Sequence, residues 1–326
     1  MKFLNTVLGG FFLIAAQLVQ AQTPSANDVA TYPNRTIRII VPFTPGGVTD
    51  VLMRLVAQKM SDDFKQTVIV ENRPGGNAMI GTEIVAKAPP DGYTIGAVSA
   101  AHTVNKALFK KLPYDPMESF VPISVLGSTP LVVVVNATSP YKDIRELSIA
   151  LRQSPQELTY GAGTTAIHLW TQMYVRGVGG RALYVPYKGS SAPQIDLMAG
   201  SLSMVLDTPT ALIGNINAGK FRALAVTGSR RSGVLPDVPT INETVLPGMD
   251  NKSWQGLLAP KGTPPEIVAK LNAEIVRILK MPDVVQKLTV LGIDPVGSSS
   301  DEFTKMMQSE IARWQKAVKD LGIDPE

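Results

Sequence analysis

The sequence lacks cysteine altogether and contains only two histidines, His102 and His168. Without cysteine the chain forms no disulfide, binds no metal through thiolates and has no cysteine nucleophile. The two histidines show neither an H-x-x-x-H nor an H-E-x-x-H spacing, so we expect no metal site. A G-x-S-x-G nucleophile elbow is also missing. We therefore expect a protein that is not an enzyme, with no catalytic residue and no cofactor.

Charged residues are scarce, at 18% of the chain, whereas 44% of the 326 residues are hydrophobic. This balance excludes an intrinsically disordered chain. A mean hydropathy of only +0.10 excludes a bundle of membrane spans. The net charge is +4, and the basic residues are scattered, with no run longer than Lys110-Lys111 or Arg230-Arg231. Because nucleic-acid-binding surfaces usually cluster basic charge, we expect no nucleic-acid partner.

The first 21 residues have the pattern of a secretory signal. Met1-Lys2 precedes a short apolar run, and Val19-Gln20-Ala21 supplies small residues at the positions that a signal peptidase reads. The run is shorter than the about 20 residues that a membrane span needs. We expect cleavage between Ala21 and Gln22 and a soluble, exported product. A lipoprotein signal requires a cysteine at the cleavage site, so we expect no lipid anchor.

Strand and helix patterns alternate along the rest of the chain. Hydrophobic spacing predicts strands at 37–41, 68–70, 94–99, 121–126, 131–135, 158–160, 183–185, 204–206 and 223–226. Helices are predicted at 51–64, 79–86, 170–175, 195–198, 264–279, 284–291 and 301–321, with Asp301 as a cap of the last one. This alternation is typical of α/β proteins with mostly parallel sheets flanked by helices.

The length of the chain suggests two domains. Two similar strand-helix series are separated by the strand region at 121–135 and followed by a helical tail. We expect a discontinuous first lobe made of residues 32–128 and 255–326, and a second lobe made of residues 129–254. The three tryptophans, Trp170, Trp254 and Trp314, are expected to pack in the core or between the domains.

The loop after the first predicted strand is the strongest candidate for a ligand site. It reads Pro42-Phe43-Thr44-Pro45-Gly46-Gly47-Val48-Thr49-Asp50 and leads into the first predicted helix. The first amides of a helix lack internal partners and carry partial positive charge, and glycines let an anion approach the backbone. Thr49 or Asp50 could cap this helix. The alternative is a tight turn that binds nothing.

A second glycine loop, Gly161-Ala162-Gly163-Thr164-Thr165-Ala166, matches the dinucleotide pattern G-x-G-x-x-A. That pattern requires an acidic residue about 20 positions later, where this chain has Val185-Pro186-Tyr187-Lys188. We therefore expect the loop to offer amides and hydroxyls to a small anion instead. A third loop, Gly75 to Thr82, lacks the lysine of a P-loop and is expected to be a turn before a helix.

Three other residues have open roles. Asp207 ends a predicted strand, where it could accept hydrogen bonds from a water or a ligand amine, or could form an Asx-turn or a helix cap. Lys188 lies near Ser190 and Ser191, which allows a Ser/Lys catalytic pair, although a loop lining the ligand crevice is the preferred interpretation. His168 is expected to be a packed or half-buried residue.

A series of short motifs covers nearly the whole chain after the leader. The motifs are Val41-Pro42-Phe43-x-Pro45-Gly46-Gly47-x-x-Asp50, Val70-Glu71-Asn72-Arg73-Pro74-Gly75, Pro90-Asp91-Gly92-Tyr93-Thr94, Leu112-Pro113-Tyr114-Asp115-Pro116, Val185-Pro186-Tyr187-Lys188-Gly189, Leu235-Pro236-Asp237-Val238-Pro239-Thr240 and Ala259-Pro260-x-Gly262-Thr263-Pro264. Together they closely resemble the Bug family, also called the TctC family. The members of this family are periplasmic solute-binding proteins of tripartite tricarboxylate transporters.

The resemblance implies a two-lobed Venus-flytrap fold of the type II periplasmic binding proteins. It implies that backbone amides, hydroxyls and ordered water bind a ligand carboxylate. The ligand-binding residues expected on the first lobe are Phe43, Pro45, Gly46, Gly47, Val48, Thr49, Asp50 and Ser99, and those on the second lobe are Gly161, Gly163, Thr164, Thr165 and Asp207. The family usually has Ser-Ser-Gly-x-Gly-Ser in the second loop, so the threonine methyl groups here narrow the site.

The resulting prediction is a periplasmic, monomeric binding protein. It captures a di- or tricarboxylate, an amino acid or an aromatic acid and delivers it to integral membrane transporter subunits. Two alternatives remain. The loaded protein could dock on a signalling receptor, or the chain could be an exported Ser/Lys hydrolase that uses Lys188.

Overall fold

The computed structural model describes residues 29–153 and 158–325. The predicted signal sequence and its cleavage site lie outside the described residues. Within these two ranges, no helix combines the length and the apolar character that crossing a bilayer requires.

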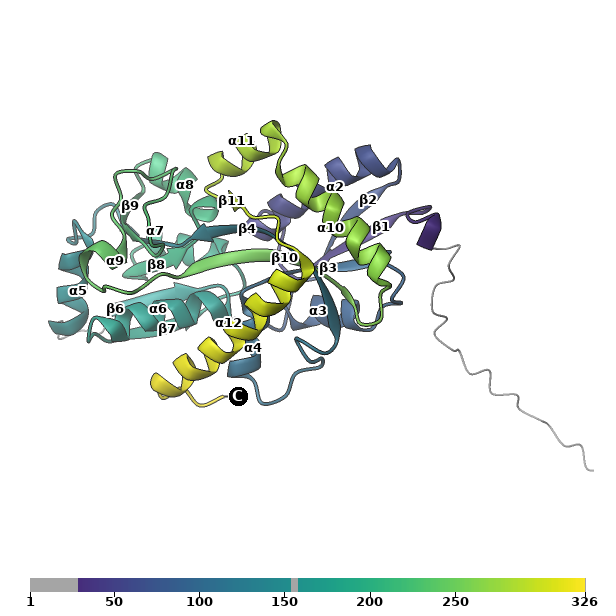
Figure 1. Ribbon diagram of the computed structural model, residues 1–326. Helices are drawn as coiled ribbons and strands as arrows, with labels where there is room; N and C mark the ends of the chain where they lie inside the picture. The colour runs from purple at the N-terminus through teal and green to yellow at the C-terminus, as the bar shows by residue number, and fades with distance from the viewer. Residues whose placement is uncertain (1–28, 154–157, 326) are drawn as a thin grey trace, which may run out of the picture.

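Two β-sheets form the centre of the molecule (Figure 1). The first sheet has six strands in the order β11 (Asp294–Pro295), β4 (Phe120–Pro130), β10 (Lys252–Pro260), β3 (Thr94–Ser99), β1 (Ile37–Val41) and β2 (Val68–Asn72). The second sheet has five strands in the order β7 (Ala182–Pro186), β6 (Leu158–Ala162), β8 (Met204–Asp207), β5 (Val132–Asn136) and β9 (Phe221–Val226).

Helices flank both sheets. The first sheet is accompanied by α2 (Val48–Phe64), α3 (Met79–Ala86), α4 (Ala101–Leu108), α10 (Pro265–Leu279), α11 (Pro282–Val290) and α12 (Ser300–Asp320). The second sheet is accompanied by α5 (Ile144–Gln153), α6 (Thr165–Gly177), α7 (Ser191–Met198), α8 (Pro209–Asn217) and α9 (Ile241–Thr244). We call the first sheet with its helices the first unit, and the second sheet with its helices the second unit.

Strand pairing is parallel in one half of each sheet and antiparallel in the other, so the sheets are more mixed than the sequence pattern suggested. β2, β1 and β3 run parallel to one another, as do β7, β6 and β8. These strands are joined through helices, as parallel neighbours require. β4 continues almost directly into β5, and β10 pairs antiparallel with β4 along its length. The chain therefore leaves and re-enters the first sheet on two adjacent strands of opposite direction (Figure 1).

The apolar periodicity of the sequence corresponds to the buried faces of the elements. In α10, Ile267, Leu271, Ile275 and Ile278 are at most 2% exposed and pack in one cluster with side chains of β1 and α2. Burial of one such side chain contributes about 1.5–3 kcal/mol. The helix is thus held on the first sheet by a single apolar stripe.

The last helix connects the two units. Trp314 on α12 and Trp170 on α6 meet edge to face, with ring centroids 5.7 Å apart, and both are buried. Trp254 on β10 is also buried, against Phe303 of α12. The prediction that the tryptophans are packing residues is confirmed. The predicted cap of α12 is wrong, because Ser299 accepts from the Glu302 amide and Glu302 accepts from the Ser299 amide, which places Asp301 within the first turn.

Candidate functional site

The loop between β1 and α2 presents exposed backbone to the solvent. Thr44, Pro45 and Gly46 are exposed, and Gly46 has a φ of +83°, a conformation that glycine adopts at low cost. Gly47 is the N-cap of α2, and no side chain caps this helix. The prediction that Thr49 or Asp50 caps it is wrong, since both lie within the first turn and are nearly fully buried.

The buried Asp50 carboxylate stabilises the conformation of this loop through hydrogen bonds. It accepts hydrogen bonds from the Gly46 amide at 2.9 Å, from Arg54 Nε at 3.1 Å and from Asn72 Nδ2 at 2.8 Å. Asn72 Nδ2 also donates to the Phe43 carbonyl at 3.0 Å. Burial alone would raise the pKa of Asp50, but the hydrogen bonds from Arg54, Gly46 and Asn72 outweigh it and hold the pKa below its usual value.

This network changes the role expected for Asp50. Both carboxylate oxygens are occupied by partners within the protein, so the residue positions the loop. Arg54 and Asn72 were not among the residues expected from the sequence. Asn72 belongs to the Val70–Gly75 motif that carries the family resemblance, and that motif was the available signal.

The second glycine loop leads from β6 into α6. Thr164 is the N-cap, and its hydroxyl accepts a hydrogen bond from the Ile167 amide at 3.2 Å. A Cβ atom added to Gly163 would lie 2.3 Å from the backbone of Gly189, and one added to Gly161 would lie 2.7 Å from Leu202. The two glycines that match the dinucleotide pattern are therefore required by close packing within the second unit.

A third loop, between β7 and α7, lies between the two glycine loops and connects the two units. Gly189 lies between β7 and α7, and its amide donates to the Gly163 carbonyl at 3.2 Å. A Cβ atom added to Gly189 would lie 3.0 Å from the Thr44 hydroxyl of the first unit. Thr44, Gly163 and Gly189 thus lie next to one another, and the N-termini of α2 and α6 are brought to the same region. Thr44 and Gly189 were missing from the expected ligand set, although Thr44 lies in the first glycine loop and Gly189 ends the Val185–Gly189 motif.

Asp207 is buried at the end of β8, at 2% exposure. Its Oδ1 accepts from the Thr208 amide at 2.7 Å, and burial raises its pKa, although hydrogen bonds from Ser190 and Thr208 act in the opposite direction. None of the ion pairs between described residues includes Asp207. The contact with Ser190 connects it to the loop that carries Gly189. Asp207 does not cap α8, whose N-cap is Thr208.

The remaining expected residues of the first unit surround the first loop. Ser99 ends β3, and its hydroxyl accepts from the Ala101 amide at 3.3 Å. Phe43 and Val48 are half-buried and pack against the core of the first unit. Phe43 and Val48 are therefore partly covered by the core of the first unit, and only their exposed parts are accessible to a ligand.

The two histidines are packing residues in the structure. His168 Nδ1 lies 2.9 Å from the Tyr160 hydroxyl, and its ring centroid lies 3.9 Å from that of Tyr184. His102 Nε2 donates to the Pro116 carbonyl at 3.0 Å. Burial lowers the pKa of each histidine to about 4, so both are neutral near pH 7. Among residues 29–153 and 158–325, no cluster of three potential metal-binding side chains occurs.

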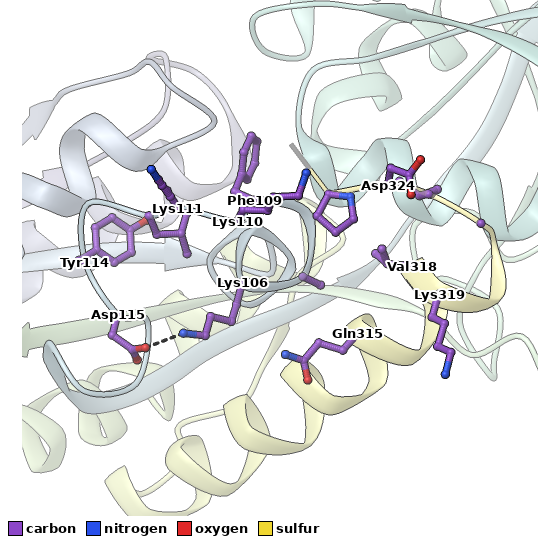
Figure 2. Close-up of a pocket in the computed structure, with 15 residues that line it drawn as sticks. Lys106, Phe109, Lys110, Lys111, Tyr114, Asp115, Gln315, Val318, Lys319 and Asp324 are labelled. Carbon is purple, nitrogen blue, oxygen red and sulfur yellow. Dashed lines mark hydrogen bonds and ion pairs between the residues drawn. The ribbon is translucent and has the colours of Figure 1, made fainter.

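A pocket of about 1050 Å³ lies away from these loops, between the α4–β4 connection and the C-terminal end of α12 (Figure 2). Lysines contribute much of its polar lining, and Lys106 Nζ lies 2.6 Å from Asp115 Oδ2. None of the expected ligand-binding residues lines this pocket. It is therefore distinct from the region where the two glycine loops meet.

Comparison with known proteins gives consistent matches along the chain. Residues 52–323 match the family model described as the tripartite tricarboxylate transporter family receptor. A UPF0065 protein from the tcbD-tcbE intergenic region of Pseudomonas sp. strain P51 is 39% identical, with 95% of this chain and 94% of the relative aligned. Protein BugT of Bordetella pertussis is 35% identical, with 96% of each chain aligned.

Solved structures are also similar. R. palustris Rpa4515 with adipate has 35% sequence identity and a TM-score of 0.87, covering 90% of this chain and all of that protein. MatC from Rhodopseudomonas palustris with bound malate has 32% identity and a TM-score of 0.82, covering 88% of this chain and all of that protein.

Proposed function

Because this chain belongs to the TctC family of tripartite tricarboxylate transporter receptors, we propose that it binds a small dicarboxylate between its two units and delivers it to a membrane transporter. Membership confirms the family resemblance, and the similar structures confirm the two-lobed periplasmic-binding-protein fold. Members of this family are periplasmic solute-binding proteins.

One observation supports the location of the site: Gly189, in the loop before α7, lies against both Thr44 in the loop before α2 and Gly163 in the loop before α6. Helix geometry leaves the first amides of α2 and α6 without intrahelical partners. The two helix dipoles add partial positive charge at the same place. A carboxylate between them would accept hydrogen bonds from both units.

Charge compensation would come from backbone dipoles more than from cationic side chains. Arg54, which lies behind the first loop, is already paired with Asp50. Lys188, next to Gly189 in the second unit, is exposed. A carboxylate would therefore depend on the precise orientation of amides, which the Asp50–Asn72 network maintains in the first loop.

The proposed mechanism is closure of the two units around the ligand. In the open form the carboxylate would bind the loop of one unit, and closure would add donors of the other unit and exclude water. A ligand shifts this equilibrium only if it binds the closed form more tightly. Donors from both units would provide that difference.

The dicarboxylate class is favoured because similar proteins hold adipate and malate. The methyl group of Thr164 narrows the second loop, which favours a slender aliphatic chain over an aromatic acid. Ligand specificity is proposed to depend on Val48 in the first loop and on Thr164 in the second.

A thermal-shift screen followed by calorimetry tests this proposal. The panel contains adipate, malate, citrate, glutamate and benzoate, with acetate and choline as size and charge controls. A ligand at 100 times its Kd stabilises the folded state by about 2.7 kcal/mol. We expect a rise in melting temperature with adipate or malate and none with choline. If no carboxylate of the panel raises it, the dicarboxylate assignment is wrong.

We also propose the assembly and processing of the protein. Residues 1–21 are removed on export, residues 32–128 and 255–326 form the first lobe, and residues 129–254 form the second. The direct passage from β4 to β5 and the return into β10 support boundaries close to these, because β4 ends at Pro130 and β10 begins at Lys252. N-terminal sequencing of the periplasmic protein tests the cleavage site. Light scattering of the purified protein tests whether it is a monomer. Capture of detergent-solubilised membrane proteins on the loaded protein distinguishes permease subunits from a signalling receptor as the partner.

Within the described residues, no structural feature favours the hydrolase alternative. Lys188 is exposed, and no hydrogen bond joins it to Ser190 or Ser191 in this part of the chain. The family and the similar structures are solute-binding proteins.

A further inference from the structure

A buried asparagine on α4 bridges the two units. Asn105 is fully buried, and its Nδ2 donates to the Asn77 carbonyl at 2.8 Å. Its Oδ1 accepts from the Thr165 hydroxyl at 2.9 Å. The carbonyl oxygen of Asn77 can only accept a hydrogen bond, so the side-chain amide nitrogen of Asn105 must face it. The side-chain oxygen of Asn105 then faces the Thr165 hydroxyl. The orientation of the side chain is therefore fixed by its partners.

The two hydrogen bonds differ in what they connect. Asn77 lies between β2 and α3, in the same unit as Asn105, whereas Thr165 begins α6 in the second unit. Separation of the units would break the bond to Thr165 and leave the bond to Asn77 intact. The Thr165 hydroxyl is available for this bond because Thr164, the preceding residue, caps α6.

The segment that holds Asn105 in place is itself in an uncommon conformation. Asn77 and Ala78 have φ values of 52° and 73°, in the left-handed region that side chains other than glycine and asparagine rarely adopt. The Asn105 amide binds the carbonyl within this segment. The contact that orients the Asn105 side chain therefore lies within the first unit and does not depend on closure of the second unit.

We propose that Asn105 is a positioning residue that stabilises the closed form through Thr165 and thereby sets ligand affinity without contacting the ligand. This inference rests on the proposed function, because it assigns the closure step of the same site. Since the bond forms only after closure, its loss should accelerate ligand dissociation and leave association unchanged.

The test uses stopped-flow kinetics and calorimetry with adipate and malate on Asn105→Ala, Thr165→Val and the double variant. A neutral hydrogen bond corresponds to roughly 3- to 10-fold in Kd. We expect each single variant to bind about 3- to 10-fold more weakly through faster dissociation. The double variant should be no weaker than the worse single variant, because both remove the same bond. Thr165→Ser should restore wild-type affinity.

Two controls separate this role from a general loss of structure. Lys106→Ala changes the next residue of α4, which faces the pocket in Figure 2 and pairs with Asp115, so it should leave Kd within about twofold. If Asn105→Ala does not fold, Thr165→Val and Thr165→Ser decide the question. Additive losses in the double variant, or unchanged dissociation rates in the single variants, would overturn the proposal.

A ligand-free measurement keeps this test independent of the proposed function. The chain has no cysteine, so a donor and an acceptor dye can be attached at Lys87→Cys and Ser201→Cys, two exposed positions on different units. We expect Asn105→Ala to reduce the closed fraction of the ligand-free protein. An unchanged closed fraction overturns the role of Asn105, whereas absence of binding by the wild-type protein overturns the ligand assignment alone.

Discussion

Replacement of Gly47 by aspartate tests whether an anion binds at the N-terminus of α2. Gly47 has φ −75° and ψ 166°, which any residue adopts, and a Cβ atom added to it would lie 3.7 Å from the Thr44 carbonyl oxygen, an ordinary contact. Aspartate and asparagine are both favoured N-caps and differ from glycine by only a few tenths of a kcal/mol. Neither substitution should weaken the fold.

The effect on binding should depend on charge. Two like charges about 4 Å apart repel by about 4 kcal/mol at an effective dielectric constant of 20. Since about 1.4 kcal/mol corresponds to tenfold in affinity, Gly47→Asp should weaken dicarboxylate binding by about 100- to 1000-fold. Gly47→Asn has nearly the same shape without the charge, so it isolates the electrostatic contribution and should lose far less.

Calorimetry with adipate or malate gives Kd for the wild type and both variants, and differential scanning calorimetry gives their melting temperatures. We expect the melting temperatures to agree within about 2 °C. Equal affinities for Gly47→Asp and Gly47→Asn would show that no anion lies near this helix terminus, and the proposed site would then be wrong.

Three further predictions concern stability. Gly163→Ala places a Cβ atom 2.3 Å from the Gly189 backbone, so it should lower the free energy of unfolding by about 1–3 kcal/mol. Urea denaturation measures this change, and an unchanged free energy of unfolding would show that the loop shifts to accommodate the Cβ atom without cost. Leu271→Ala leaves a cavity under α10 and should cost about 2–5 kcal/mol in the same assay; a loss below 1 kcal/mol would contradict the described packing. The pKa of His102 is about 4 in the folded protein and about 6.5 in the unfolded chain, so the unfolded chain binds more protons between these values, and stability should fall as the pH drops from 6.5 to 4. His168 has the same lowered pKa, so His102→Gln should make the decline less steep without abolishing it, and an equally steep decline in the variant would show that His102 does not contribute.

The sequence predicted most of the strands because β-branched runs end at proline or glycine, and it predicted α10 because its apolar stripe is regular. It did not predict α4, which is polar on part of its surface yet buried by α6 and α12, so its environment depends on tertiary packing. The strand β10 was also missed, since Gln255 and Ser253 interrupt its apolar pattern although both are buried. Antiparallel pairing could not be anticipated, because it depends on how the chain crosses between the two units.

The candidate site was only partly predictable, because some of its residues come together only through tertiary packing. The glycine loops are visible in the sequence, because helix starts after strands have a recognisable composition. The residues that shape and join these loops, such as Asn72, Asn105 and Gly189, act across long sequence distances. Asp50 was expected to contact the ligand, but its carboxylate is occupied by Gly46, Arg54 and Asn72.

A crystal structure of the protein with the tightest-binding dicarboxylate tests the central claim most directly. We expect one ligand carboxylate within hydrogen-bond distance of backbone amides at the N-termini of both α2 and α6, next to Thr44 and Gly189. A ligand held by the lysines of the pocket between α4 and α12, or by one unit alone with the two units closed, would contradict the proposed site.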